Sequence, residues 1–193
     1  PFYHAGQELL RSKSFDSNSF DSGDWFNPLD FSYRDNGWGR GLPPAWDNEA
    51  NWPIAGPMLA DESLQPSEVD IRFAFDHLKE MLRIRKSSPL FRLPTAEAVK
   101  NSLSFLNTGP EQVPGLIAMR LEGGEETIVV LFNATPEDQA FVVSGAQGFE
   151  LHPVQAESAD PVVRRSGFDN GTLFVPARTT AVFVAAAPRK AAD

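Results

Sequence analysis

The long stretch between residues 11 and 66 constrains the fold more than any other part of the sequence. It brings Trp, Phe, Tyr and Asp together, above all in residues 19–41, yet its apolar residues repeat with neither a helical nor a strand period. Turn-forming pairs such as Ser22-Gly23 and Asn36-Gly37 interrupt it. Loops longer than about 12–15 residues are uncommon in compact domains unless they are functional or disordered. Because this stretch is too aromatic for disorder, we expect an ordered, functional loop.

The aromatic residues divide the chain in a similar way. All four Trp and both Tyr lie within residues 1–52, and the rest of the chain uses only Phe. Trp and Tyr in loops offer an amphipathic contact surface, with an apolar face and a polar tip. The first part of the chain is therefore the better candidate for ligand contact.

Composition bounds the class of protein. The 193 residues are 41% hydrophobic, which is enough for a real core in one large domain or two small ones. The formal net charge of −9 argues against nucleic acid or an anionic membrane surface as partner and leaves a neutral or cationic ligand open. The absence of cysteine excludes a disulfide framework and a thiolate nucleophile. No apolar run is long enough for a membrane span, and nothing in the sequence fixes the compartment.

Residues 67–88 carry a helical pattern. Ser67 with Asp70 resembles a capping box in which Asp replaces the usual Glu, and Pro89 ends the pattern. The spacing predicts a helix of about 20 residues, or roughly 30 Å. Its apolar positions are Ile71, Ala74, Phe75, Leu78, Met81 and Leu82.

Beyond Pro89 the pattern changes to short β-rich runs between Gly, Pro and Asn clusters, which predicts an antiparallel β-sandwich over residues 89–187. A short helix is expected first, over 95–103, and residues 188–193 are expected to fray. The predicted strands are 115–123, 127–135, 139–144, 172–177 and 180–186.

The first ten residues, "PFYHAGQELL", suggest the second half of a buried strand, with no initiator Met and no signal-peptide pattern. One strand and one helix cannot bury their own apolar faces. We therefore expect the last βα unit of a larger α/β body, with an all-β module behind it, and we expect this chain to be a piece of a longer protein.

Several long motifs resemble pullulanase-type debranching enzymes of the α-amylase superfamily, a group that includes bacterial pullulanases and plant limit dextrinases. These motifs are "ELLRSKS" (8–14), "SGDWFN" (22–27), "IRKSSPLF" (84–91) and "LNTGPEQVPGLIAM" (106–119). The resemblance covers nearly the whole chain.

The resemblance implies that residues 1–88 are the end of a catalytic (β/α)₈ barrel. Residues 1–10 would be strand eight, 11–66 the loop after it, and 67–88 helix eight. Barrel active sites lie on such βα loops, so the opening loop would line the glucan cleft. The superfamily's loop aspartate bonds hydroxyls of a glucose on the non-reducing side of the cleaved bond, a role that would fall to Asp24.

The residues themselves support a sugar site at Asp24, Trp25, Phe26 and Asn27. A sugar offers hydroxyls to carboxylates and amides, and apolar CH faces to aromatic rings, and these four residues offer both kinds of contact. Alternatively, Trp25 packs the loop and Asp24 caps a turn. Pro28 stands where relatives commonly carry a basic residue, so any contact made by that side chain is lost or comes from Arg34 or Arg40.

The resemblance also shows what is missing. The family cleaves α-1,6-glucosidic bonds with retention, which takes a carboxylate nucleophile and a carboxylic acid about 5 Å apart. Both, and a third aspartate, belong to strands four, five and seven, which precede strand eight. We therefore predict no catalytic residue in this chain, and no activity from the 193-residue chain by itself.

Three other functions stay open at this stage: an α-1,4-acting amylase fragment, a carbohydrate-binding module, and a structural domain that shields the barrel. Residues 89–193 contain no Trp or Tyr, which argues against a binding module. For the β-rich half itself, the structural role is favoured.

We expect no cofactor and no metal site in the chain, although a calcium ion elsewhere in the intact enzyme stays open. Residues 16–24, "DSNSFDSGD", alternate oxygen-bearing side chains but lack the Gly and Glu that an EF-hand requires. His77 and His152 have no Ser or Cys partner that would suggest a catalytic triad.

Overall fold

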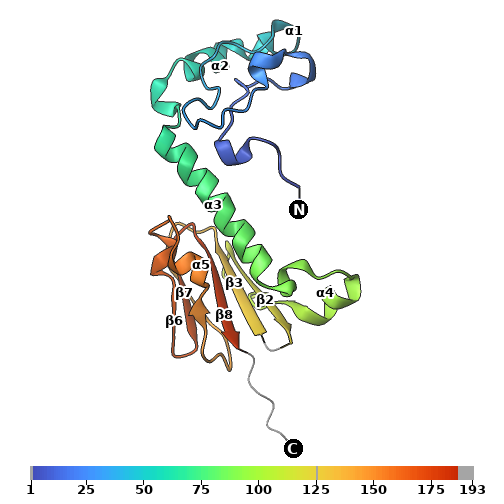
Figure 1. Cartoon of the computed structure of the whole chain (residues 1–193). Helices are drawn as coiled ribbons and strands as arrows, with labels where there is room; N and C mark the ends of the chain where they lie inside the picture. The colour runs from blue at the N-terminus through green and yellow to red at the C-terminus, as the bar shows by residue number, and fades with distance from the viewer. Residues whose placement is uncertain (1, 125, 187–193) are drawn as a thin grey trace, which may run out of the picture. The chain divides into compact units, whose positions relative to one another are not determined.

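The computed structural model describes residues 2–124 and 126–186, so the expected frayed tail at 188–193 lies outside the described residues. The chain divides into two compact units, Pro1–Leu78 and Lys79–Asp193, called unit 1 and unit 2 below. The division falls within helix α3 (Glu68–Ser87), ahead of the boundary expected after residue 88, because the end of α3 packs with unit 2 (Figure 1). In the described part of the chain, no helix is long and apolar enough to cross a lipid bilayer.

Unit 1 contains helices and turns, and residues 2–78 form no strand. The strand expected over residues 1–10 is therefore not seen: the chain makes a 3₁₀ turn there, entered through Gly6 at φ 92°. A strand is held by hydrogen bonds to a neighbouring strand, and unit 1 offers none among its described residues. Its elements are η1 (Gln7–Leu9), η2 (Ser19–Asp21), η3 (Asp24–Phe26), α1 (Ala45–Asn48), η4 (Glu49–Asn51), α2 (Trp52–Leu59) and η5 (Glu62–Leu64).

Helix α3 begins as its sequence predicts. The Asp70 N–H donates to Ser67 Oγ at 3.3 Å, and the Ser67 N–H donates to the Asp70 carboxylate at 2.8 Å, which is a reciprocal capping box. The helix ends at Ser87, and the next residue, Ser88, caps the 3₁₀ helix η6 (Pro89–Arg92) by accepting from the Leu90 N–H. The predicted bounds of 67–88 thus hold to within one residue at each end.

Unit 2 contains two antiparallel sheets (Figure 1). The five-stranded sheet has the order β1-β2-β3-β8-β5, and the three-stranded sheet has the order β4-β7-β6. All five predicted strand runs are present, as β2, β3, β4, β7 and β8. The strands are β1 (Leu103–Phe105), β2 (Leu116–Gly123), β3 (Glu126–Asn133), β4 (Gln139–Val142), β5 (Glu150–Leu151), β6 (Gly167–Asp169), β7 (Thr172–Val175) and β8 (Thr180–Ala186).

Besides η6, the described part of unit 2 contains three short helices: α4 (Ala96–Ser102), α5 (Pro153–Ala156) and η7 (Val163–Arg165). Helix α4 lies where a short helix was expected, and Thr95 caps it through a 3.1 Å hydrogen bond from the Ala98 N–H. α5 and η7 were not expected, because segments this short show no helical period.

The core of unit 2 occupies both faces of the five-stranded sheet. Side chains alternate along a strand, so each strand of the sheet supplies both faces. On one face, residues such as Leu131 and Phe183 pack with Leu173 and Val175 of the three-stranded sheet. On the other face, Ile84 of α3 packs with a second apolar cluster. That cluster also contains Leu90, Leu121, Ile128, Val130 and Val182.

Candidate functional site

The four predicted sugar-binding residues lie at the 3₁₀ turn η3, and the structure divides them into two pairs. Asp24 is exposed, and Trp25 is 46% exposed. Phe26 is buried at 4% exposure, and Asn27 is half-buried. The first pair is thus open to a ligand, whereas the second belongs to the interior of the loop.

Asn27 fixes the turn through its side-chain amide. Its Oδ1 accepts a 3.0 Å hydrogen bond from Lys13 Nζ, and its Nδ2 donates to the Ser19 carbonyl at 2.9 Å and to the Gly23 carbonyl at 3.3 Å. Lys13 Nζ also donates to Ser19 Oγ at 2.5 Å. Because these bonds occupy both ends of the amide, Asn27 acts on the loop and has little capacity left for a ligand.

Trp25 is held by its neighbours on both sides. Its ring packs on Phe26 with centroids 3.9 Å apart, and its carbonyl accepts a 3.0 Å hydrogen bond from Arg40 Nη1. Arg40 Nη2 in turn pairs with Asp35 Oδ2 at 2.7 Å. Gly41, at φ 130°, lies so close that a Cβ there would approach the indole ring to 3.3 Å. The indole position is therefore set by contacts within the loop.

The carboxylate of Asp24 makes no hydrogen bond or ion pair with any described residue. Its backbone is fixed, because its carbonyl accepts from the Asn27 N–H at 3.0 Å. An exposed carboxylate on a fixed turn can accept two or more hydrogen bonds from the hydroxyls of a ligand. Asp24 and Trp25 thus place an acceptor and an aromatic face next to each other.

Asp16 and Asn48 form a polar hub that the sequence did not reveal. Asn48 is fully buried; its Oδ1 accepts from the Ser17 N–H at 3.0 Å, and its Nδ2 donates to Asp16 Oδ1 at 2.9 Å. Asp16 also accepts from Ser22 Oγ. Burial opposes ionisation of Asp16, but the hydrogen bonds from Ser22 and Asn48 outweigh it and hold the pKa of Asp16 below its ordinary value.

The hub bears on the calcium interpretation of residues 16–24. The Asp16 carboxylate that would have to serve as a metal ligand is already occupied by protein donors. Among the described residues, no group of three or more His, Cys, Asp or Glu side chains is arranged to hold a metal ion. Within this run, Asp16 and Ser22 bond to each other, and Asp16 also accepts from Asn48.

Asp30 organises the next turn. Its carboxylate accepts from Ser32 Oγ at 2.7 Å and from the backbone N–H groups of Ser32 and Asp35, both at 2.9 Å. These bonds, the Ser32 hydroxyl first, lower the pKa of Asp30 to about 2. Two arginines could supply the contact of the basic side chain that Pro28 lacks. Arg40 already donates to Trp25 and Asp35, whereas Arg34 is exposed.

His152 in unit 2 does have a serine partner, which corrects the sequence-based prediction. Its Nε2 lies 3.0 Å from Ser87 Oγ, although the two residues are far apart in the sequence. Its Nδ1 accepts from the Val154 N–H at 3.2 Å, so in the neutral ring Nε2 carries the proton and donates to Ser87. Ser87 Oγ donates to the Ile84 carbonyl at 2.8 Å. The imidazole therefore cannot take the serine proton, and the pair joins α3 to α5 structurally.

A protein-family match covers most of the chain. Residues 33–186 match the family described as "Alpha-1,6-glucosidases, pullulanase-type, C-terminal". This chain belongs to that family, as the motifs in its sequence indicated.

Three relatives illustrate the similarity. The chain is 48% identical to "Pullulanase 1, chloroplastic" of Arabidopsis thaliana over 95% of its length, and it spans 21% of that protein. It superposes on PulA from Klebsiella oxytoca with a TM-score of 0.83 at 30% identity, covering 96% of this chain and 19% of that one. A maltotriose complex of PulA from Klebsiella pneumoniae gives a TM-score of 0.81 at 31% identity, covering 96% and 21%. The chain thus spans about a fifth of the length of these relatives.

Proposed function

We propose that this chain is the C-terminal part of a debranching enzyme that hydrolyses α-1,6-glucosidic bonds in pullulan, starch or glycogen with retention of configuration. Residues 1–88 would complete a (β/α)₈ barrel, and residues 89–187 would form its C-terminal β-sandwich. The catalytic carboxylates would come from the part of the enzyme that precedes this chain. Family membership and the similarity to pullulanases support this proposal.

Within that enzyme, Asp24 and Trp25 would contact the glucan. The Asp24 carboxylate would accept hydrogen bonds from glucose hydroxyls, and the indole of Trp25 would pack against an apolar sugar face. Phe26 and Asn27 would serve the site indirectly, by holding the turn from inside. The observation that carries the proposal is the pairing of an exposed, unpartnered carboxylate with an exposed indole on a turn locked by hydrogen bonds.

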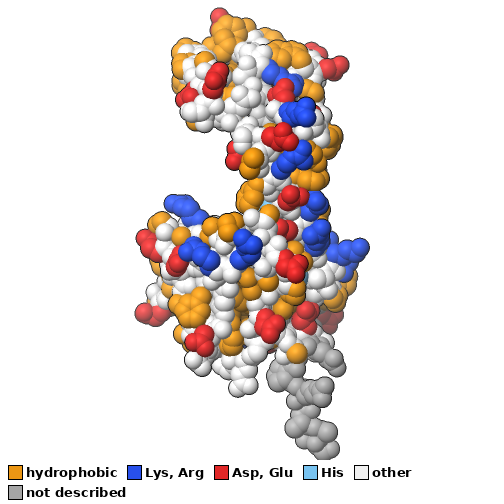
Figure 2. Space-filling view, turned by 60° about the vertical axis from the view of Figure 1, so that its left-hand side comes forward, with side chains coloured by type: hydrophobic (Ala, Val, Ile, Leu, Met, Phe, Trp, Pro, Cys, Tyr) orange, Lys and Arg blue, Asp and Glu red, His pale blue; other side chains and the backbone are white. Residues whose placement is uncertain are grey.

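The remainder of the barrel would be the main partner of unit 1. Figure 2 shows hydrophobic side chains gathered at the surface of the region that Figure 1 draws in blue and cyan. A monomeric protein rarely leaves so many large apolar side chains uncovered. In the described part of unit 1, the most exposed are Phe2, Phe20, Val69, Ile54, Phe31 and Trp46. Their burial against the barrel would complete the core that unit 1 lacks, and the 193-residue chain alone would be inactive.

The alternatives have less support. An α-1,4-acting amylase is disfavoured by the family match, which is to α-1,6-glucosidases. A free-standing carbohydrate-binding module is disfavoured because unit 2 contains no Trp or Tyr to serve as a sugar platform. The proposed reaction needs no cofactor, and it leaves a calcium ion elsewhere in the intact enzyme open.

The test is substitution in the intact enzyme. Replacing Asp24 with Ala removes hydrogen bonds to a charged group, so kcat/KM on pullulan should fall about 10- to 100-fold. The kcat/KM of Asp24→Asn should lie between those of the parent enzyme and Asp24→Ala, because the amide keeps one acceptor oxygen. Trp25→Ala should reduce kcat/KM by about tenfold through lost stacking area.

An exposed carboxylate and an exposed aromatic ring outside the turn provide the controls. Asp47→Ala in α1 and Phe174→Ala in β7 should leave kcat/KM within about twofold of the parent enzyme. Equal losses of kcat/KM in the test and control variants, or an unchanged kcat/KM in Asp24→Ala, would contradict the proposal that this turn contacts the glucan.

A further inference from the structure

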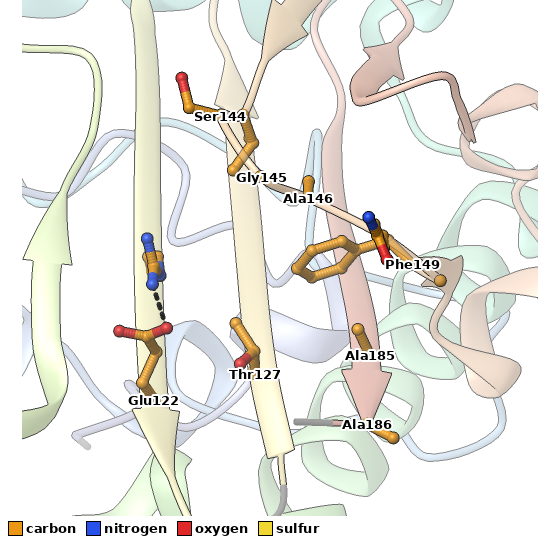
Figure 3. Close-up of a pocket in the computed structure, with 12 residues that line it drawn as sticks. Glu122, Thr127, Ser144, Gly145, Ala146, Phe149, Ala185 and Ala186 are labelled. Atoms are coloured by element: carbon orange, nitrogen blue, oxygen red, sulfur yellow. Dashed lines mark hydrogen bonds and ion pairs between the residues drawn. The ribbon is translucent and has the colours of Figure 1, made fainter. Parts of the chain in front are cut away.

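A pocket opens at one end of unit 2, between the inner face of the five-stranded sheet and the connection from β4 to β5 (Figure 3). Its volume is about 460 Å³, which lies within the range of small-molecule sites, about 300–1,000 Å³. Residues 143–149 form one wall, and β2, β3 and β8 form the other. The pocket lies wholly within unit 2 and is separate from the Asp24–Trp25 turn.

The inner face of the sheet changes character as it reaches this pocket. Leu116 and Ala118 of β2 face the apolar core, and the next two residues on the same face are Arg120 and Glu122. On β3, Thr127 takes the position next to the buried Val129. Polar side chains thus replace the apolar ones on the inner face where it borders the pocket.

Arg120 and Glu122 form an ion pair at the pocket, marked by the dashed line at Glu122 in Figure 3. The side chains are 32% and 47% exposed, so a ligand in the pocket can reach the pair. With the described residues, the guanidinium makes only this one contact, and its buried Nε has no hydrogen-bond partner. A guanidinium has five N–H donors, so most of the capacity of Arg120 is unused.

The rest of the wall is apolar. Figure 3 shows the ring of Phe149 pointing into the space beside Thr127, Ala146 and Ala185. Phe149 is held there by the edge of Phe168, with ring centroids 5.8 Å apart. The pocket therefore combines one aromatic ring, small apolar side chains, a hydroxyl and a charge pair with no net charge.

We propose that this pocket binds a short neutral α-glucan, as a second carbohydrate site formed by residues of unit 2 alone. The assignment of the sugar class rests on the proposed function. Each sugar hydroxyl both donates and accepts, so adjacent hydroxyls can donate to Glu122 and accept from Arg120 without breaking the pair. An anion would have to sit beside the Glu122 carboxylate in a chain of formal net charge −9.

The site differs from a typical carbohydrate-binding module, because it has one largely buried Phe and no Trp or Tyr. Its affinity would come from charge-assisted hydrogen bonds, which are stronger than neutral ones. A site of this kind would hold one branch of a polymeric substrate and raise its local concentration at the enzyme.

The experiment uses the 193-residue chain with Asp24 and Trp25 both replaced by Ala, so that the turn no longer contributes. Maltotriose binding is followed by saturation-transfer NMR, and folding of every variant by circular dichroism. We expect saturable binding that weakens about tenfold or more when Arg120→Met and Glu122→Gln are added together. The matched control adds Arg164→Met and Glu157→Gln, which change the same charges at exposed positions away from the pocket, and should bind like the parent.

A second variant keeps the test decisive if removal of the pair unfolds unit 2. Thr127→Phe fills the pocket and leaves the ion pair in place, and it should also abolish binding. Unchanged affinity in both pocket variants, absence of saturable binding in the parent, or saturation by inorganic phosphate in place of maltotriose would overturn the proposal. Failure of the proposed function would appear separately, as absence of pullulan hydrolysis by the intact parent enzyme.

Discussion

In unit 2 the large side chains with no exposure, such as Phe183 and Leu131, are mostly apolar and belong to the sheets, whereas in unit 1 the fully buried side chains include Asn48 and Ser14. Unit 2 has two continuous apolar clusters. Unit 1 is held largely by carboxylates and amides that accept and donate across the loop. Apolar packing thus stabilises one unit, and side-chain hydrogen bonds stabilise the other. A loop that presents polar side chains to a ligand can also be held in place by polar side chains.

The largest effect expected from this comparison is in the core of unit 2. Phe183→Ala should lower the free energy of unfolding by about 3–5 kcal/mol, because it leaves a cavity where Phe183 has no exposure. Urea denaturation followed by far-UV circular dichroism measures this. Phe174→Ala, at a residue 42% exposed, should cost less than about 1 kcal/mol and serves as the control.

Tryptophan fluorescence provides the complementary signal, because all four Trp residues lie in unit 1. It should report a smaller shift than circular dichroism for Phe183→Ala. If Phe183→Ala shifts the fluorescence and circular dichroism midpoints by the same amount, the two units unfold together. The difference in how their cores are built would then not appear as a difference in stability.

The polar hub of unit 1 should respond next. Asn48→Ala leaves the Ser17 N–H and the Asp16 carboxylate without their buried partner, which should cost about 2–3 kcal/mol. The midpoint of the fluorescence transition in urea measures the loss. Asn51→Ala removes the same amide at an exposed position and should shift that midpoint little. A similar loss in both variants would mean that burial of the hub is not what stabilises unit 1.

The smallest expected effect is the pH dependence of stability. The two units should lose stability in different pH ranges. Burial lowers the pKa of His152 in unit 2, and the nearby Glu126 opposes this in part. The unfolded state then binds more protons, so the contribution of His152 is complete above pH 6.5 and declines below it, by at most about 1.4 kcal/mol per pH unit. Urea midpoints at pH 7.5 and 5.5 should differ by circular dichroism, and His152→Gln should reduce the difference.

Unit 1 should lose stability at a lower pH. The pKa of Asp30 falls from 3.8 to about 2, so its contribution is present above pH 3.8 and disappears as the pH drops toward 2. Asp16 and Asp35 are shifted in the same direction. A fluorescence transition that responds between pH 5.5 and 7.5 as strongly as circular dichroism would contradict this separation.

The fold was predictable wherever a segment was long enough to show a period. The helix from Glu68 to Ser87 and the runs that became β2, β3 and β8 are of this kind. Strands β1, β5 and β6 were missed, because two or three residues show no alternation. The short helices α1 and α2 were not predicted, because they lie in a stretch without a helical period, and α2 contains Pro57.

The sequence was sufficient to locate the candidate site, but not to assign a role to each of its residues. The cluster from Asp24 to Asn27 was identified from its chemistry, yet only the structure shows that Phe26 points inward and that the Asn27 amide is occupied. The pairing of Asp16 with Asn48, and of Ser87 with His152, joins residues too far apart for sequence spacing to reveal.

The glycine beside Trp25 has a consequence for how tolerance to mutation is interpreted in this loop. Gly41 adopts φ 130°, which side chains rarely allow, and a Cβ there would press on the indole at 3.3 Å. A survey of all substitutions would find this position intolerant although it offers no side chain to a sugar. Intolerance at Gly41 would reflect its backbone conformation and its contact with the indole ring. A residue that only shapes the binding surface would then be counted among those that touch the ligand.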